Sequence, residues 1–234
     1  MLSRIVVAVI WIPVLLLVIF VLPPFALPCA LAILAAVGAY ELLWRTSLLR
    51  NMRMVLYSMA ISAAIPIWVY CGANGTAAVC GLLLYMILLF AESMANLQNA
   101  AFEKIGLSFF AGVVIPFFLA SFVRLDLRPE GKYIVLLPFI AAFSSDAVAL
   151  FAGMLFGRRK LAPSLSPKKT VEGAIGGFVG GIAMLLLYGL LVQVFFFCQV
   201  NYPLLAVYGL LGSVFSQFGD LAFSYIKREC QIKD

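Results

Sequence analysis

The chain has 234 residues, of which 65% are hydrophobic and only 11% are charged, and its mean hydropathy is +1.12. Because soluble domains carry about 25% charged residues, this composition excludes a soluble protein and indicates an integral membrane protein. The sequence has no histidine, which excludes histidine-ligated metals and histidine acid–base chemistry, and its net charge of +6 mostly reflects Lys and Arg in loops.

Eight apolar stretches along the chain are predicted to be membrane spans, since their lengths approach or reach the roughly 20 residues that a transmembrane helix needs. They lack the alternation expected of transmembrane barrel strands. The predicted spans cover residues 5–22, 25–44, 54–70, 77–91, 105–123, 133–156, 171–198 and 204–226. The sequence therefore predicts an all-α polytopic membrane protein with about eight transmembrane helices. Residues 1–132 would hold the first five spans, and residues 133–234 would form the catalytic part.

The charges of the loops predict the orientation of these spans. Lys and Arg gather near the N-terminus, in residues 45–53, at Lys104, in the basic loop 157–169 and at the C-terminal end, all on one side of an eight-span chain. The positive-inside rule places that side in the cytoplasm. The loop 124–132 mixes both signs on the opposite side and departs from the pattern.

Two acidic residues fall inside predicted spans. Asp146 lies about 11 residues before the basic loop, hence roughly 16 Å deep by helical rise, and Asp220 lies near the end of the last span. Because an ionised acid in a bilayer is costly, each should face a partner or a water-filled cavity, and Ser144 and Ser145 favour a cavity around Asp146. Asp146 could instead be a structural acid paired with a neighbouring helix. Together the two carboxylates could share a hard cation such as Mg²⁺.

The segment SPKKTVEG, residues 166–173, is typical of a helix start. Thr170 is a candidate N-cap, and Glu172 falls in the first turn, where a carboxylate is favoured. Lys168 and Lys169 precede this N-terminus, whose free N–H groups already attract anions. The combination suits a triphosphate and its metal, while an ordinary positive-inside loop is the alternative that spacing leaves open.

Glycines recur along the seventh span. Gly173, Gly177 and Gly181 are four residues apart, and Gly176 and Gly180 form a neighbouring stripe. Because small residues let transmembrane helices approach closely, these glycines are predicted to pack helices rather than to bind phosphate.

These residues resemble the phosphatidate cytidylyltransferases, also called CDP-diacylglycerol synthases. The resemblance spans the chain and is closest over residues 146–177, where Asp146, FGRRKLAP and SPKKTVEG look like the family's pattern, with Val171 in place of its usual Trp. Near the end, the sequence resembles the opening of the family's C-terminal signature at Gly219-Asp220-Leu221, Ser224, Lys227, Arg228, Lys233 and Asp234.

In that family the signature continues into a glycine-rich turn with a His and a helix with two further Asp residues. The resemblance therefore implies a ninth helix beyond Asp234, and we expect the chain as given to be truncated within the signature.

The resemblance implies transfer of a cytidylyl group from CTP to phosphatidate, giving CDP-diacylglycerol and pyrophosphate in phospholipid synthesis. It implies a multi-pass enzyme of the bacterial inner membrane whose site faces the cytoplasm. The implied partners are the two substrates and membrane lipid, with no nucleic acid, and a homodimer is left open.

The implied cofactor is Mg²⁺, held by Asp220 and Asp146, with a second cation left open. The implied catalytic residues are Asp220, Lys169 and Lys227. The implied substrate-binding residues are Ser166, Lys168, Thr170, Glu172, Ser224, Arg228, Lys233 and Asp234.

Other functions are open on the residues alone. A polyprenol kinase or an archaeal-type lipid cytidylyltransferase would share a membrane-embedded phosphate site. A transporter could use the intramembrane acids on an ion path, but the halves of the chain show no convincing repeat, and a transporter does not need SPKKT beside a helix start. An inactive remnant is a further alternative.

Overall fold

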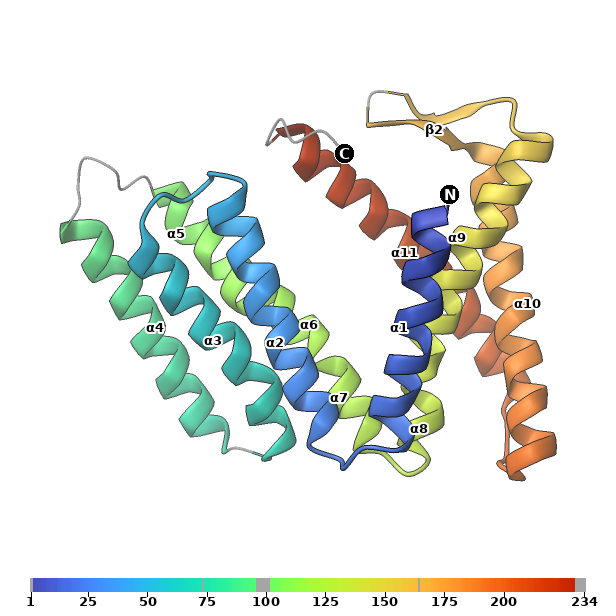
Figure 1. The fold of residues 1–234 in the computed structure, drawn as a ribbon, viewed down its shortest axis with the longest axis horizontal. Coiled ribbons are helices and arrows are strands. Elements are labelled where there is room, and N and C mark those ends of the chain that lie inside the picture. Colours follow the sequence, from blue (N-terminus) through green and yellow to red (C-terminus); the bar gives the residue numbers. More distant parts are fainter. Residues whose placement is uncertain (1, 73, 96–101, 164, 230–234) are drawn as a thin grey trace. The chain divides into compact units, whose positions relative to one another are not determined.

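A computed structural model of the chain describes residues 2–72, 74–95, 102–163 and 165–229. Apart from turns and loops, these residues form helices and one short two-stranded hairpin (Figure 1). The chain divides into two compact units, Met1–Lys132 and Tyr133–Asp234. Within the described ranges, seven helical segments are long and apolar enough to cross a membrane: Ala26–Arg45, Met52–Tyr70, Gly75–Ala95, Phe102–Asp126, Gly131–Phe156, Val171–Phe196 and Tyr202–Glu229. Helix α1 spans Leu2–Phe20, and its part Trp11–Phe20 counts as a shorter apolar helix. The prediction of an all-α polytopic membrane protein is confirmed.

The first unit is built from helices of uneven regularity. Its elements are α1, α2 (Ala26–Tyr40), a π-helical turn η1 (Glu41–Arg45), α3 (Met52–Tyr70), α4 (Gly75–Ala95), α5 (Phe102–Phe109), a second π-helical turn η2 (Phe110–Val114), α6 (Ile115–Leu119) and α7 (Ser121–Asp126). The short α8 (Gly131–Ile134) lies at the boundary between the units. The predicted fifth span is thus three helices and a π-turn in succession.

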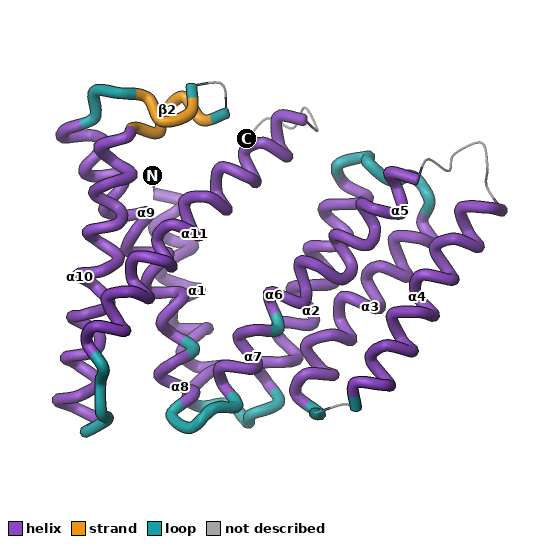
Figure 2. Tube along the Cα trace, turned by 180° about the vertical axis from the view of Figure 1, so that it is seen from behind, coloured by secondary structure: helices purple, strands orange, loops and turns teal. Residues whose placement is uncertain are grey.

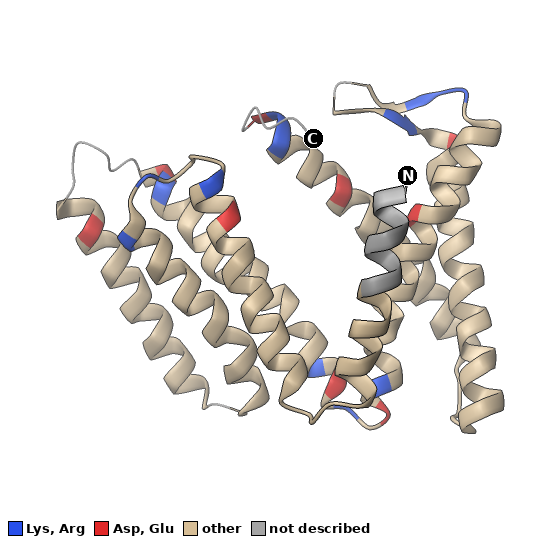
Figure 3. Cartoon of the chain, viewed as in Figure 1, with Lys and Arg blue, Asp and Glu red and all other residues tan. Residues whose placement is uncertain are grey.

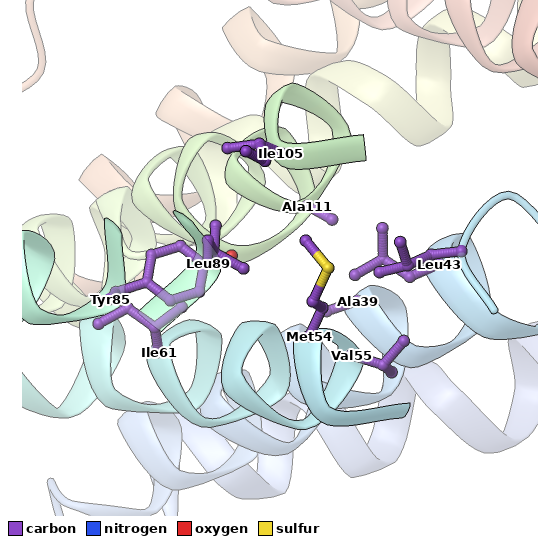
Figure 4. Packing of buried hydrophobic residues seen from close by; sticks show 10 residues of the cluster. Ala39, Leu43, Met54, Val55, Ile61, Tyr85, Leu89, Ile105 and Ala111 are labelled. Carbon is purple, nitrogen blue, oxygen red and sulfur yellow. The ribbon is translucent and has the colours of Figure 1, made fainter. Parts of the chain in front are cut away.

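The core of the first unit joins α2, α3, α4 and α5. Figure 4 shows Leu43, Val55 and Leu89 among the side chains of this cluster, and none of the three is exposed to solvent. The hydroxyl of Tyr85, in the same cluster, lies 2.8 Å from Ser58 Oγ and donates to the carbonyl of Ser108 at 2.8 Å. The phenol thereby satisfies its polar atom inside an apolar core and ties α3, α4 and α5 together.

The second unit is a bundle of three long helices with the hairpin at one end. Its elements are α9 (Leu136–Phe156), β1 (Lys160–Ala162), β2 (Ser166–Thr170), α10 (Val171–Phe196) and α11 (Tyr202–Glu229). Helix α10 packs against both α9 and α11, and α9 also packs against α11 (Figure 2). The strands are antiparallel, with Lys160 opposite Thr170 and Ala162 opposite Ser166.

The hairpin differs from the prediction of a plain basic loop over residues 157–169. Its strands are three and five residues long, too short for an alternating pattern to stand out. Contacts with the helices hold it, and a sequence does not display such contacts.

Glycines let α10 approach both neighbours. On the α9 side, a Cβ at Gly180 would lie 2.5 Å from Val148 Cβ, and one at Gly176 would meet Ala152. On the α11 side, a Cβ at Gly181 would collide with Ser213. The prediction that these glycines pack helices is confirmed: Gly173 also faces α9, and Gly177 lies between α9 and α11.

Charge in the second unit gathers at the end that carries the hairpin (Figure 3). Between Glu172 and Asp220 the sequence has no charged residue, so the opposite end, around residues 196–202, is uncharged. The cytoplasmic orientation of the basic end stays a prediction from the positive-inside rule.

Candidate functional site

The start of α10 is fixed by Thr170, as the sequence predicts. Thr170 is the N-cap, with extended backbone at φ −120° and ψ 154°, and its Oγ1 accepts from the backbone N–H of Gly173 at 3.1 Å. The hydroxyl is enclosed by glycines, because a Cβ at Gly153 or Gly157 would come within 3.0 Å of it. The end of α9 can therefore lie directly against the start of α10.

Glu172, in the first turn of α10, holds the chain that enters the hairpin. Its Oε2 accepts from the backbone N–H groups of Arg158 at 3.0 Å and Arg159 at 3.2 Å. The backbone N–H of Val171 donates to the carbonyl of Arg159 at 2.9 Å and closes the same junction. The structure thus gives the Glu172 carboxylate backbone partners, where the resemblance implied a substrate-binding residue.

The two lysines of β2 differ in their surroundings. Lys168 is exposed, whereas Lys169 is half-buried and its ammonium forms an ion pair with the Asp220 carboxylate of α11. Neighbouring residues of a strand point to opposite faces, so only one of the pair can face the bundle. The ion pair links the hairpin to the last helix.

Asp146 lies near this ion pair. It is in the middle of α9, its charge interacts with those of Asp220 and Lys169, and its carboxylate is hydrogen-bonded by the Ser216 side chain of α11. Three charged side chains from α9, β2 and α11 therefore converge on one place. The sequence predicted that the two acids and a lysine act together, and the structure brings these three together.

Ser144 and Ser145, expected beside a cavity, are instead buried between helices. Ser144 is 8% exposed and donates to the Ile140 carbonyl of its own helix at 2.6 Å. Ser145 is fully buried, and its Oγ accepts from Gln217 Nε2 of α11 at 3.2 Å. The polar character of this stretch therefore serves helix packing.

The remaining predicted residues follow the ion pair along α11 or lie on the hairpin. Ser224, one turn after Asp220, donates to the Asp220 carbonyl at 2.8 Å. Lys227 lies two turns after Asp220 on the same helical face, about 10 Å along the axis, and is exposed, as is Arg228. Ser166 is half-buried at the start of β2. Lys233 and Asp234 lie outside the described residues.

Ser216 and Gln217 are the residues that sequence reasoning missed. Both are polar residues in a predicted apolar span, separated from the Gly219-Asp220 pair by Phe218 alone. Polar side chains in a membrane helix usually have a partner on a neighbouring helix, and that signal was available.

The charge pattern suits a phosphorylated ligand. Two carboxylates are the kind of oxygen ligands that Mg²⁺ takes, and Mg²⁺ commonly completes its shell with water and substrate phosphates. Lysine ammonium groups are common phosphate partners. In the described part of the chain no three His, Cys, Asp or Glu side chains gather into a closed metal site.

Comparison with known proteins points to one family. Residues 2–234 match the family described as "Cytidylyltransferase family". The phosphatidate cytidylyltransferase of Bacillus subtilis (strain 168) is 31% identical over 153 residues, which cover 64% of this chain and 55% of the relative.

Two further relatives carry the same name. The phosphatidate cytidylyltransferase of Staphylococcus saprophyticus is 37% identical over 109 residues, covering 47% of this chain and 40% of the relative. That of Haemophilus influenzae is 27% identical over 253 residues, covering 99% of this chain and 88% of the relative. The chain spans about half the length of the Bacillus and Staphylococcus relatives.

Proposed function

The chain belongs to the cytidylyltransferase family, and from that premise we propose that it transfers a cytidylyl group from CTP to phosphatidate. The products are CDP-diacylglycerol and pyrophosphate. The observation that carries this proposal is the convergence of Lys169, Asp220 and Asp146 from three different elements at the charged end of the second unit. The names of relatives from Bacillus and Haemophilus support the choice of substrates.

The reaction exchanges one phosphorus–oxygen bond for another. An oxygen of the phosphatidate phosphate attacks the α-phosphorus of CTP, a new bond forms between them, and the bond from the α-phosphorus to the bridging oxygen breaks. The electron pair of that bond leaves with pyrophosphate. A phosphate monoester carries a charge of about −1.5 to −2 at pH 7, so the nucleophile is already ionised and needs no general base. Catalysis then depends on positioning and on neutralising the phosphates.

The acidic residues would hold Mg²⁺. Asp220 and Asp146 supply two carboxylates whose charges already act on each other, and Ser216 supplies a hydroxyl beside them. When bound, Mg²⁺ supplies positive charge that offsets the negative charge developing on the phosphates. Asp220 is accessible for this role, because its side chain is 56% exposed.

The lysines would hold the phosphates. Lys169 is placed at the acids by β2, and its charge is balanced by Asp220 until an anionic substrate takes it. Lys168 presents a second ammonium on the exposed face of the same strand, and Lys227 and Arg228 lie in the last turn of α11. Thr170 and Glu172 act indirectly, since they fix the start of α10 and the hairpin.

We place the site at the cytoplasmic face of a bacterial inner membrane. The hairpin and the end of α11 carry the basic residues of the second unit, and the loop at its other end carries none. A site there would meet a water-soluble nucleotide on one side and a lipid headgroup on the other.

The proposal is tested by product formation from labelled CTP with the chain purified in detergent. With phosphatidate and Mg²⁺ we expect labelled CDP-diacylglycerol and an equal amount of pyrophosphate, and with a polyprenol we expect neither. A prenyl phosphate product, or no phosphatidate-dependent product at any Mg²⁺ concentration, would refute the proposal.

A matched pair of hairpin variants tests the assignment of Lys169. Lys169→Gln should lower turnover on the order of 100-fold, because it removes charge beside the acids. Lys160→Gln makes the same charge change on β1, where the ammonium donates to the Pro167 carbonyl at 2.6 Å, and should leave turnover within about threefold. Equal losses in the two variants would mean that the hairpin contributes only general positive charge.

A further inference from the structure

We propose that Gln217 is a positioning residue, whose side-chain amide sets α11 against α9 and α10 so that Asp146 and Asp220 face the same point. The metal-binding part of this inference rests on the proposed function, and the geometric part does not. Gln217 is 8% exposed in α11. Its Nε2 donates to Ser145 Oγ of α9 at 3.2 Å and to the Ala174 carbonyl of α10 at 3.1 Å. One amide group therefore bridges all three long helices of the second unit.

The bridge uses both N–H groups that a glutamine amide has. A buried amide without partners is costly in an apolar helix, so a glutamine at this place is stable only while its neighbours keep their positions. The Ala174 carbonyl lies in the first turn of α10, where Thr170 and Glu172 already fix the helix to the hairpin. The amide thus connects α11 to the capped first turn of α10.

The neighbouring helix leaves room for this amide. A Cβ at Gly177 of α10 would lie 2.5 Å from Gln217 Nε2 and 3.0 Å from Ser145 Oγ. Any other residue at position 177 would push the amide away from its two acceptors. The absence of a side chain at Gly177, which also lets α10 lie close to α9, therefore leaves the Gln217 amide room for both hydrogen bonds.

The residues of the Gln217 bridge are neighbours in the sequence of the residues of the charged cluster. Ser145 immediately precedes Asp146 in α9, and Gln217 immediately follows Ser216, which hydrogen-bonds Asp146. Asp220 follows Gln217 by three residues, close to one turn of helix. A helix turns by about 100° and rises 1.5 Å per residue, so holding Gln217 in place fixes both the height and the direction of Asp220.

A buried glutamine could also serve packing alone, and the two roles differ in measurable ways. A packing role lowers stability and leaves the residual activity with its normal dependence on Mg²⁺. A positioning role changes the spacing of the carboxylates, and so the Mg²⁺ dependence and kcat, while the KM for phosphatidate stays near its normal value.

The geometric part is tested by cross-linking, which requires no activity. Cysteines replace Asp146 and Asp220 in a chain whose five native cysteines are replaced by serine, and a short bifunctional maleimide joins them in detergent. We expect efficient cross-linking with Gln217 present and a rate about fivefold lower with Gln217→Met, which keeps the size of the side chain but removes the donors. Unchanged cross-linking in Gln217→Met, or none in the parent, would overturn the inference.

The metal-binding part is tested with Mn²⁺ as the probe, by electron paramagnetic resonance without substrates. Gln217→Met and, to a smaller extent, Ser145→Ala should weaken Mn²⁺ binding, by about tenfold for the first. The double variant should bind Mn²⁺ almost as tightly as Gln217→Met alone, because each single substitution removes the same contact between Gln217 and Ser145. The control is Ser213→Ala, which removes a buried hydroxyl that donates to the Gly209 carbonyl of its own helix at 2.7 Å and should leave Mn²⁺ binding unchanged. Equal effects of Ser213→Ala and Gln217→Met would overturn the positioning role.

These two tests separate failure of the inference from failure of the proposed function. Slower cross-linking in Gln217→Met together with no product from CTP would keep the positioning role and reject the reaction. Product formation with normal kcat and normal Mg²⁺ dependence in Gln217→Met would keep the reaction and reject the positioning role.

Discussion

Replacing Gly180 with alanine tests whether close approach of α9 and α10 holds the second unit together. The added Cβ would lie 2.5 Å from both Cβ and Cγ2 of Val148 and 3.0 Å from its Cγ1. Carbon atoms in contact are normally about 3.5–4.0 Å apart, so the shortfall is about 1 Å. Val148 is β-branched and has little rotamer freedom in a helix, so the helices themselves must separate.

The matched control is Gly219→Ala, in α11 of the same unit. No atom lies within 4 Å of a Cβ at Gly219, so this variant meets no obstacle. Both substitutions gain the same helix propensity, about 1 kcal/mol, which cancels in the comparison. The difference between them isolates the steric cost, for which overpacking suggests about 1–3 kcal/mol.

The assay is unfolding of the two variants in mixed detergent micelles, followed by the loss of helical circular dichroism. We expect Gly180→Ala to lower the free energy of unfolding by about 1–3 kcal/mol relative to Gly219→Ala. Equal values within about 0.5 kcal/mol would refute the idea that contact between the helix backbones stabilises this unit.

Three further predictions follow from the contacts of the site. Thr170→Ala removes the N-cap of α10 and should lower the free energy of unfolding by about 1 kcal/mol in the same detergent unfolding assay. Thr170→Ser keeps a capping hydroxyl and should lose only a small part of that stability. Glu172→Gln weakens the acceptor for two backbone N–H groups, so hydrogen exchange read by mass spectrometry should become faster at Arg158 and Arg159 and stay unchanged in α11. Asp220→Asn should lower Mg²⁺-dependent pyrophosphate release on the order of 100-fold, and full activity in that variant would remove Asp220 from the metal assignment.

The transmembrane architecture could be predicted from the sequence because length and hydropathy alone determine which segments can cross a bilayer. The same holds for the Thr170 cap and for the glycine stripe, which depend on residue type and local spacing. In each case the signal lies within one helix or at its end. The π-turn at Phe110–Val114 carries no such signal, and the break in the fifth span was not predicted.

The detailed site depends on relations between helices, which one sequence does not display. Ser144 and Ser145 were expected beside a cavity, yet a rotation of about 100° per residue determines whether neighbouring side chains face a cavity or a helix. The hairpin was missed because Glu172 and Asp220 hold it through contacts distant in sequence. The roles of the two aspartates and the lysines stay predictions.

The Lys169–Asp220 ion pair makes the two halves of the proposed site thermodynamically dependent on each other. An anion that draws the Lys169 ammonium away from Asp220 leaves that carboxylate without its partner, so such an anion must also separate the pair. A cation that neutralises Asp220 removes the electrostatic cost of separating the ion pair before the anion binds. By linkage, the anion strengthens cation binding by the same factor. Nucleotide and metal would thus be taken up together more readily than either alone, a cooperativity built from a single contact between a strand and a helix.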